Sequence, residues 1–181
     1  MTMVIDRLEY RRAIGAFATG VTVITTRRGE EIHGMTANSL TSVSLDPLLL
    51  LICVDRRARM AGLLMEGARF AVNMLSDRQE AISRHFAGRP QPDIQISFAE
   101  LDDVPAIPEA LSTLACTVEQ VHDGGDHTIV VGRVDALTRA LIDLPPLLYF
   151  AGRYRQLAPD MHPAAPGAEE DFFYHNIISF V

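Results

Sequence analysis

Small hydroxyl and amide side chains are concentrated just before one of the most apolar segments of the sequence. Residues 36–44 read TANSLTSVS, and the leucine-rich run 48–54 follows directly after Asp46-Pro47. Short hydroxyl and amide groups donate and accept hydrogen bonds, and their small size lets a ligand approach the backbone closely. The pattern predicts either a polar turn before a core strand or a ledge that holds a flat molecule with polar edges.

A histidine and an arginine–tyrosine pair are the other candidates for chemistry. His127 follows a Gly-Gly-Asp turn between two apolar segments, and Arg153 and Tyr154 follow the last apolar segment. An imidazole can hydrogen-bond a ligand or offset developing charge, an arginine can pair with phosphate, and a tyrosine can stack on a ring. The alternative for His127 is a solvated residue of a hairpin turn.

Motifs for hydrolysis, phosphoryl transfer and metal binding are missing from the sequence. It holds no GxGxxG after a strand pattern, no GxxxxGK[ST], no HExxH and no GxSxG. The histidines lack metal-ligand spacing, so we expect no metal site, and we expect His33 and His85 at the surface or at helix ends. A bound organic cofactor would need none of this apparatus, because the protein then supplies only orientation and electrostatics.

Composition restricts the possible partners and the cellular compartment. The 181 residues are enough for one domain, and a net charge of −7 without a lysine- or arginine-rich run argues against nucleic acid. No secretory signal and no membrane-spanning run is recognisable. Cys53 and Cys116 are single cysteines in apolar segments, expected as small core residues, which fits a reducing cytoplasm. We therefore expect a cytoplasmic protein with neither nucleic acid nor membrane as a partner.

The elements that must position the candidate residues are mostly strands. β-Branched and apolar runs predict strands at residues 21–26, 32–40, 48–54, 70–75, 111–121, 128–137 and 147–151. Helices are predicted from Asp6 to Gly20, over 56–67 and over 76–86, and the proline-containing segment 88–98 is predicted to be a loop or lid. Many strands without regular βαβ alternation predict a mainly β, α+β barrel.

Both ends of the chain carry separate predictions. Tyr10, Ile14 and Phe17 recur with helical spacing in the first helix and are expected in the core. Residues 158–171 are rich in proline, alanine and acid and read as a tether, and the apolar residues 172–181 follow. We expect one domain over residues 1–157 and a tether with an apolar tail over residues 158–181.

Five segments, taken in order, resemble the flavin reductase family, the short reductase components of two-component flavin-dependent monooxygenases. They are FATGVTVITT, GMTANSLTSVSLDPLLLLICVD, RFAVNMLS, GDHTIVVGRV and LLYFAGRYRQL, within residues 10–157. The resemblance implies an FMN-binding split β-barrel with a few flanking helices, assembled as a homodimer. It also implies reduction of FMN or FAD by NADH or NADPH through hydride transfer to flavin N5, with the reduced flavin diffusing to a partner monooxygenase.

The resemblance assigns site residues as well. Along the isoalloxazine ring and ribityl chain it places Thr36, Ala37, Asn38, Ser39, Thr41, Ser42, Val43 and Ser44. Phe86 and Ala87 wall the ring, Arg153 and Tyr154 lie near the nicotinamide dinucleotide, and His127 faces the nicotinamide as the catalytic candidate. Asn73, a polar residue within an apolar strand, is expected to satisfy a backbone group instead.

The turn after the apolar strand departs from the family pattern. In the family a serine- or threonine-containing turn after the apolar strand holds the flavin phosphate. Here Cys53, Val54, Asp55 and Arg59 are expected to bind the cofactor, but Ala58 and Met60 stand where hydroxyls are expected. An arginine (Arg56, Arg57 or Arg59), aided by the N-terminus of the next helix, can neutralise phosphate instead, and a solvated basic turn is the alternative.

Two other functions remain open on these residues. One is a split-barrel flavoprotein that retains FMN and acts directly on a small substrate. The other is a flavin-binding protein without enzymatic activity, because a shared fold does not fix a function.

Overall fold

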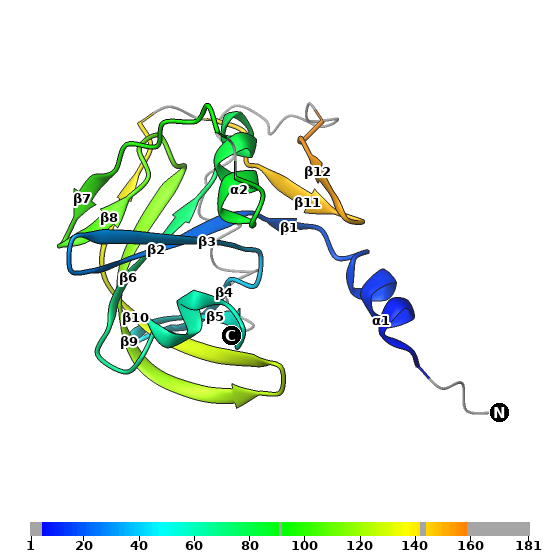
Figure 1. Cartoon of the computed structure of the whole chain (residues 1–181), viewed down its shortest axis with the longest axis horizontal. Coiled ribbons are helices and arrows are strands. Elements are labelled where there is room, and N and C mark those ends of the chain that lie inside the picture. Colours follow the sequence, from blue (N-terminus) through cyan, green and yellow to red (C-terminus); the bar gives the residue numbers. More distant parts are fainter. Residues whose placement is uncertain (1–4, 91, 142–143, 159–181) are drawn as a thin grey trace, which may run out of the picture.

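The computed structural model describes residues 5–90, 92–141 and 144–158, and its centre is a strongly curved antiparallel sheet (Figure 1). The sheet has seven strands in the order β3-β2-β6-β9-β10-β5-β4. Its strands are β2 (Thr22–Arg28), β3 (Glu31–Ala37), β4 (Thr41–Leu45), β5 (Leu48–Asp55), β6 (Arg69–Met74), β9 (Ser112–Gly124) and β10 (His127–Arg139).

Smaller elements surround this sheet. A three-stranded sheet is formed by β1 (Thr19–Gly20), β11 (Leu148–Phe150) and β12 (Arg153–Arg155), and a hairpin by β7 (Ala99–Leu101) and β8 (Val104–Ala106). The helices are α1 (Arg7–Ile14), α2 (Glu80–Phe86) and the 3-10 turns η1 (Arg59–Gly62) and η2 (Asp77–Gln79). Figure 1 shows α2 beside the β11–β12 hairpin, at one end of the curved sheet.

Alternation along β5 explains how this strand builds a barrel wall. Leu50, Ile52 and Val54 are buried in the main core, while the residues between them are partly exposed on the outer face. Successive side chains of a strand point to opposite faces, so one face of β5 fills the barrel and the other remains available. The mainly β split-barrel fold predicted from the sequence is confirmed.

The two edges of the sheet are joined by the polar segment between β3 and β4. Ser39 Oγ lies 2.9 Å from the backbone nitrogen of Cys53 and 3.1 Å from its carbonyl oxygen. This side chain therefore satisfies backbone groups of β5 where the β4 ladder, which ends at the Thr41–Leu51 pair, no longer does so. The ledge segment closes the barrel at the same time as it presents polar atoms.

Several local predictions are wrong in an informative way. The helix predicted over residues 56–67 is only the four-residue turn η1, because Met60 and Leu64 reach the core without a regular helix and Gly67 adopts φ +82°. β4, β7, β8 and β12 were not predicted as separate strands. His33, expected at the surface or a helix end, is buried on β3.

The first helix differs most from expectation. Asp6 caps α1 as predicted, with its carboxylate accepting hydrogen bonds from two backbone N–H groups. However, Tyr10, Ile14 and Phe17 are 61%, 59% and 74% exposed instead of buried, and α1 projects away from the barrel (Figure 1). Helical spacing predicts an apolar stripe but does not say which surface covers that stripe.

Two further predictions concern membrane-spanning segments and the C-terminal residues. Neither α-helix among the described residues has the length and hydropathy needed to cross a membrane. The tether and apolar tail predicted for residues 158–181 lie, except for Ala158, outside the described residues. The domain boundary therefore stays a prediction.

Candidate active site

Part of the predicted polar ledge lines a small cavity at the end of β3. The cavity has a volume of about 180 Å³. It is lined by Val21, Thr36, Ala37, Asn38, Ala87, Tyr149 and Tyr154. The structure thus brings the start of the ledge together with Ala87 and Tyr154, which lie 50 and more residues further along the chain.

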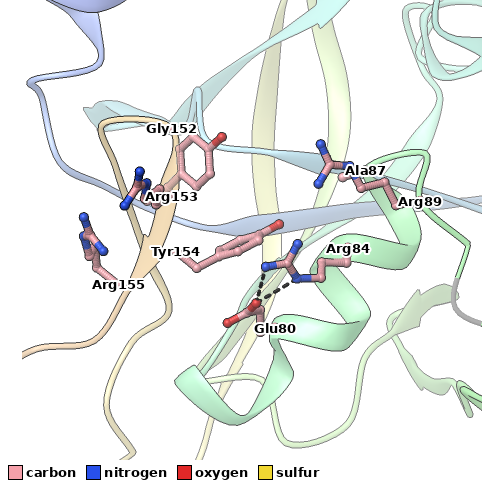
Figure 2. Close-up of a pocket in the computed structure, with 9 residues that line it drawn as sticks. Glu80, Arg84, Ala87, Arg89, Gly152, Arg153, Tyr154 and Arg155 are labelled. Carbon is pink, nitrogen blue, oxygen red and sulfur yellow. Dashed lines mark hydrogen bonds and ion pairs between the residues drawn. The ribbon is translucent and has the colours of Figure 1, made fainter.

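A larger, basic cavity adjoins the first one and shares three of its lining residues, Ala87, Tyr149 and Tyr154. Its volume is about 520 Å³, and Figure 2 shows residues that line it. The charged residues that line it are Glu80, Arg84, Arg89, Arg153 and Arg155. Four guanidinium groups against one carboxylate make this cavity suitable for an anionic ligand such as a phosphate ester.

The Tyr154 ring stands between the two cavities and is held from three directions. Its hydroxyl lies 2.8 Å from the hydroxyl of Ser83, and the Arg84 guanidinium lies 4.9 Å from the ring centroid. Tyr149 contacts the ring edge-on, with centroids 5.4 Å apart. Glu80 fixes Arg84 in turn through an ion pair of 2.6 Å (Figure 2). Such a network orients an aromatic side chain before any ligand arrives.

The remainder of the ledge is open to solvent. Asn38, Thr41 and Ser42 are exposed, and Val43 and Ser44 are partly exposed on the edge strand β4. A register irregularity between Ser42 and Ser44 interrupts the pairing with β5 and turns this edge out of regular alternation. Residues 38–44 of the ledge are therefore at least partly exposed on the outside of the barrel.

His127 occupies a separate position at the start of β10. It pairs in register with Asp55 on β5, and its Nδ1 lies 2.7 Å from a carboxylate oxygen of Asp126. The hydrogen bond to His127 lowers the pKa of Asp126. His127 lines neither of the two cavities, so within one chain the structure does not bring it together with Tyr154.

Register nevertheless connects His127 with the ledge. Val54 faces the core, and the residues on either side of it, Cys53 and Asp55, therefore face outward. Ser39 of the ledge bonds the Cys53 backbone, and His127 is paired with Asp55 two residues further along the same strand. The ledge thus runs from the small cavity toward the strand end where His127 lies.

Each arginine of the turn after β5 already has a carboxylate partner. Arg57 pairs with Asp55 at 2.7 Å, Arg59 with Glu31 at 3.0 Å, and Arg56 with Asp123 at 2.8 Å. The hydrogen bonds from Arg57 lower the pKa of Asp55 well below its usual range. The helix N-terminus expected to assist a phosphate here is absent, because the four-residue turn η1 replaces that helix.

Other predicted residues have structural roles. The Phe86 ring packs so closely on Gly34 that a Cβ added there would lie 2.4 Å from it, whereas Ala87 lines both cavities. Val54 is fully buried and packs in the main core, so in this structure it presents no surface to a ligand. Asn73 donates to the Val23 carbonyl and accepts from the Ile107 N–H, as expected for a residue that satisfies backbone groups.

The sequence pattern did not reveal most of the basic cavity. The residues missed are Glu80, Arg84, Arg89, Tyr149, Gly152 and Arg155. The only available signal was the run Arg153-Tyr154-Arg155, because Glu80, Arg84 and Arg89 lie on or just after α2, about 65 to 75 residues earlier in the sequence. Among the described residues, no group of three or more histidine, cysteine, aspartate or glutamate side chains is arranged to hold a metal ion.

This arrangement defines a split-barrel protein that can hold a flat, polar-edged ring beside an anionic ligand. The model of the flavin reductase-like domain matches residues 14–158. A curated relative, the NADH-dependent flavin reductase of Rhodococcus sp, is 42% identical over 153 residues, 83% of this chain and 86% of that protein.

A second relative is the reductase component of 4-hydroxyphenylacetate 3-monooxygenase of Thermus thermophilus, which is 40% identical over 148 residues, covering 82% of this chain and 95% of that protein. The solved NADH:FAD oxidoreductase SgcE6 of Streptomyces globisporus, in complex with NAD and FAD fragments, superimposes with a TM-score of 0.77 at 40% identity. It covers 89% of this chain and 100% of that chain. The protein belongs to the flavin reductase-like family, which confirms the resemblance.

Proposed function

We propose that this protein is an NADH-dependent flavin reductase that releases reduced flavin to a separate monooxygenase. The observation that carries the proposal is the shared wall of Ala87, Tyr149 and Tyr154 between the ledge cavity and the basic cavity. A flat ring on the ledge and a phosphate-bearing dinucleotide in the basic cavity would be neighbours. The Rhodococcus relative is named as NADH-dependent, and the Thermus relative as a monooxygenase reductase component.

The residues present fit a flavin at the ledge. Exposed hydroxyl and amide groups at Asn38, Thr41 and Ser42 can match the donors and acceptors along the edge of the ring. Ala37, a small residue at the end of β3, lines the same cavity as Asn38. When flavin and nicotinamide are bound together, they supply the chemistry themselves, a hydride transfer to flavin N5.

The basic cavity would hold the nicotinamide dinucleotide. Arg153 and Arg155 line it from β12 and can pair with pyrophosphate oxygens, while the Tyr154 ring offers a stacking surface. Hydride transfer requires the donor and acceptor atoms within about 3.5 Å in a stacked pose, so holding both molecules in place is the main task of the protein.

His127 would orient the nicotinamide carboxamide or offset developing negative charge. Its Nδ1 is held by Asp126, so Nε2 would be the ring nitrogen that meets a ligand. Support comes from the register that places His127 opposite Asp55, near the Ser39 end of the ledge. No proton has to leave the imidazole in this role.

The turn after β5 supports flavin as a released substrate. Arg56, Arg57 and Arg59 are each engaged with a carboxylate, and Ala58 and Met60 carry no hydroxyl. A flavin phosphate would find few uncommitted donors in this turn, so retention would be weak. Weak retention suits an enzyme that delivers reduced flavin to another protein by diffusion.

A homodimer and a cytoplasmic location complete the proposal. Leu8 and Ile14 on α1, and Phe17 three residues after its end, expose apolar surface, and α1 has no buried residue. A second copy of the chain is the partner that would cover this surface. The single cysteines Cys53 and Cys116 are free thiols, which fits a reducing compartment.

Titration of purified apoprotein with FMN and FAD, followed by NADH or NADPH, tests the proposal. We expect many turnovers of free flavin per protein, measured as loss of the reduced-nicotinamide absorbance. A tightly held FMN without turnover of free flavin would favour the FMN-retaining flavoprotein. If neither NADH nor NADPH reduces, and so bleaches, the bound flavin under anaerobic conditions, the protein is a flavin-binding protein without enzymatic activity.

A further inference from the structure

Ser83 connects the two walls of the site from inside helix α2. Its side chain is fully buried, its hydroxyl lies 2.8 Å from the Tyr154 hydroxyl, and its carbonyl oxygen accepts a 2.6 Å hydrogen bond from Thr36 Oγ1. Thr36 belongs to the ledge and Tyr154 to the wall between the cavities. We propose that Ser83 is a positioning residue that sets the spacing between ledge and wall, and hence the place of the nicotinamide nucleotide.

The direction of the Ser83 hydroxyl supports this role. A serine within a helix usually bonds a carbonyl of its own preceding turn or faces solvent. Here the hydroxyl instead meets a side chain on a strand 71 residues further along the sequence. Serine and tyrosine hydroxyls each donate and accept, so the pair satisfies both groups in a place where Ser83 has no access to water.

Tyr154 depends on this contact because its own strand is short. β12 has three residues and, among the described strands, pairs only with β11, which also has three. The backbone of β12 therefore leaves the ring direction to its neighbours: Arg84 on the face, Tyr149 at the edge and Ser83 at the hydroxyl. Of these three contacts, only the one with Ser83 fixes the far end of the ring.

The other bond of Ser83 acts on the ledge. The Thr36 hydroxyl donates to the Ser83 carbonyl, which also accepts the Ala87 N–H at 3.0 Å at the end of α2. Thr36 therefore holds the end of α2, including Ala87, against β3 instead of offering its hydroxyl proton to a ligand. Ser83 thus fixes the distance between the two sides of the small cavity, β3 with Thr36 and the end of α2 with Ala87.

The inference rests on the proposed function, because it assigns Tyr154 to the nicotinamide nucleotide. Loss of the Ser83 hydroxyl leaves the ring free to swing, which weakens nucleotide binding more than it slows hydride transfer. A single net hydrogen bond is expected to change the KM for NADH about three- to tenfold. The kcat at saturating NADH should change by less than about twofold.

A double-mutant cycle tests the coupling. Ser83→Ala, Tyr154→Phe and the double variant are compared by KM for NADH, kcat and melting temperature. Each single variant should raise KM by a similar factor, and the double variant should be no worse than either. Independent effects that multiply, or a KM unchanged in Ser83→Ala, would overturn the proposal. A purely structural role would lower the melting temperature without this non-additivity in KM.

Three further variants keep the result interpretable. Ser112→Ala removes a hydroxyl bonded to the Thr138 carbonyl, away from the site, and should leave KM unchanged. Tyr154→Ala removes the whole ring. If KM for NADH is unchanged in Tyr154→Ala as well as in Ser83→Ala, the assignment of Tyr154 to the nucleotide fails. If KM rises in Tyr154→Ala but not in Ser83→Ala, only the Ser83 inference fails. Should Ser83→Ala not fold, Tyr154→Phe and Ser83→Cys carry the test, and an unchanged KM in both overturns the inference.

Discussion

At the residue scale, the assignment of His127 makes a direct kinetic prediction. His127→Ala should lower the rate of flavin reduction about tenfold to a hundredfold, the range of one hydrogen bond to a charged or polarised group, and leave flavin affinity nearly unchanged. Stopped-flow absorbance gives the rate, and flavin titration gives the affinity. His122→Ala is the matched control, because His122 is an exposed neighbour on β9 that bonds only Gln120 among the residues described. An unchanged rate in His127→Ala would remove His127 from the reaction.

The thiols of Cys53 and Cys116 should differ in their reactivity. Burial raises the pKa of Cys116 to about 12, so its reactive thiolate is scarce near pH 8, whereas Cys53 lies on the outer face of β5 beside the ledge. Iodoacetamide should modify Cys53 first in the folded protein, and FMN should slow that modification. Peptide mass spectrometry measures both. Equal labelling of the two thiols, or no protection by FMN, would contradict this placement of the ledge.

At the scale of elements, the packing of β6 against β10 depends on a glycine. A Cβ added at Gly132 would lie 2.6 Å from the fully buried Phe70 ring. Gly132→Ala should therefore lower the free energy of unfolding by about 1–3 kcal/mol, because the ring cannot move without disturbing the core. Denaturant unfolding measures this. Gly62→Ala, where no atom lies within 4 Å of the added Cβ, should be close to neutral. Equal stability of the two variants would contradict the close packing.

Strands were predictable where one strong local pattern defined them. The apolar run at residues 48–54, which includes the inward residues Leu50, Ile52 and Val54, predicted β5, and the run of β-branched residues 21–26 predicted β2. The predicted helix over residues 56–67 failed because the same apolar spacing is compatible with a turn that places only Met60 and Leu64 in the core. The apolar spacing locates buried side chains more reliably than it fixes the backbone between them.

For the protein as a whole, the exposed apolar side chains of α1 and of the turn that follows it predict self-association. Ile14 and Phe17 would be costly to leave in water, so a second copy should cover them. Light scattering after size exclusion should show a dimer for the unchanged chain and a monomer for Ile14→Glu/Phe17→Glu, with reduced activity. Arg7→Glu, a charge change on the same helix, is the control and should stay dimeric. A monomeric unchanged chain would contradict the homodimer.

The site was only partly predictable from sequence, for a topological reason. The ledge is one continuous segment, so its residues 36–44 could be recognised from a local pattern. The basic cavity instead combines α2, β11 and β12, and its central contact joins Ser83 to Tyr154 across 71 residues. Side-chain types gave no sign of that contact. The exposure of the apolar side chains on α1 was likewise unpredictable, because helical spacing does not say which surface covers a stripe.

A crystal structure of the protein with FMN bound would show whether residues 36–44 seat the flavin. We expect a planar ring against these residues, with one face open toward the cavity that Tyr154 borders. The flavin phosphate should not contact Arg56, Arg57 or Arg59, which are paired with carboxylates in the turn after β5. A flavin bound elsewhere, or a ledge that closes on its own side chains in the presence of excess flavin, would contradict the account.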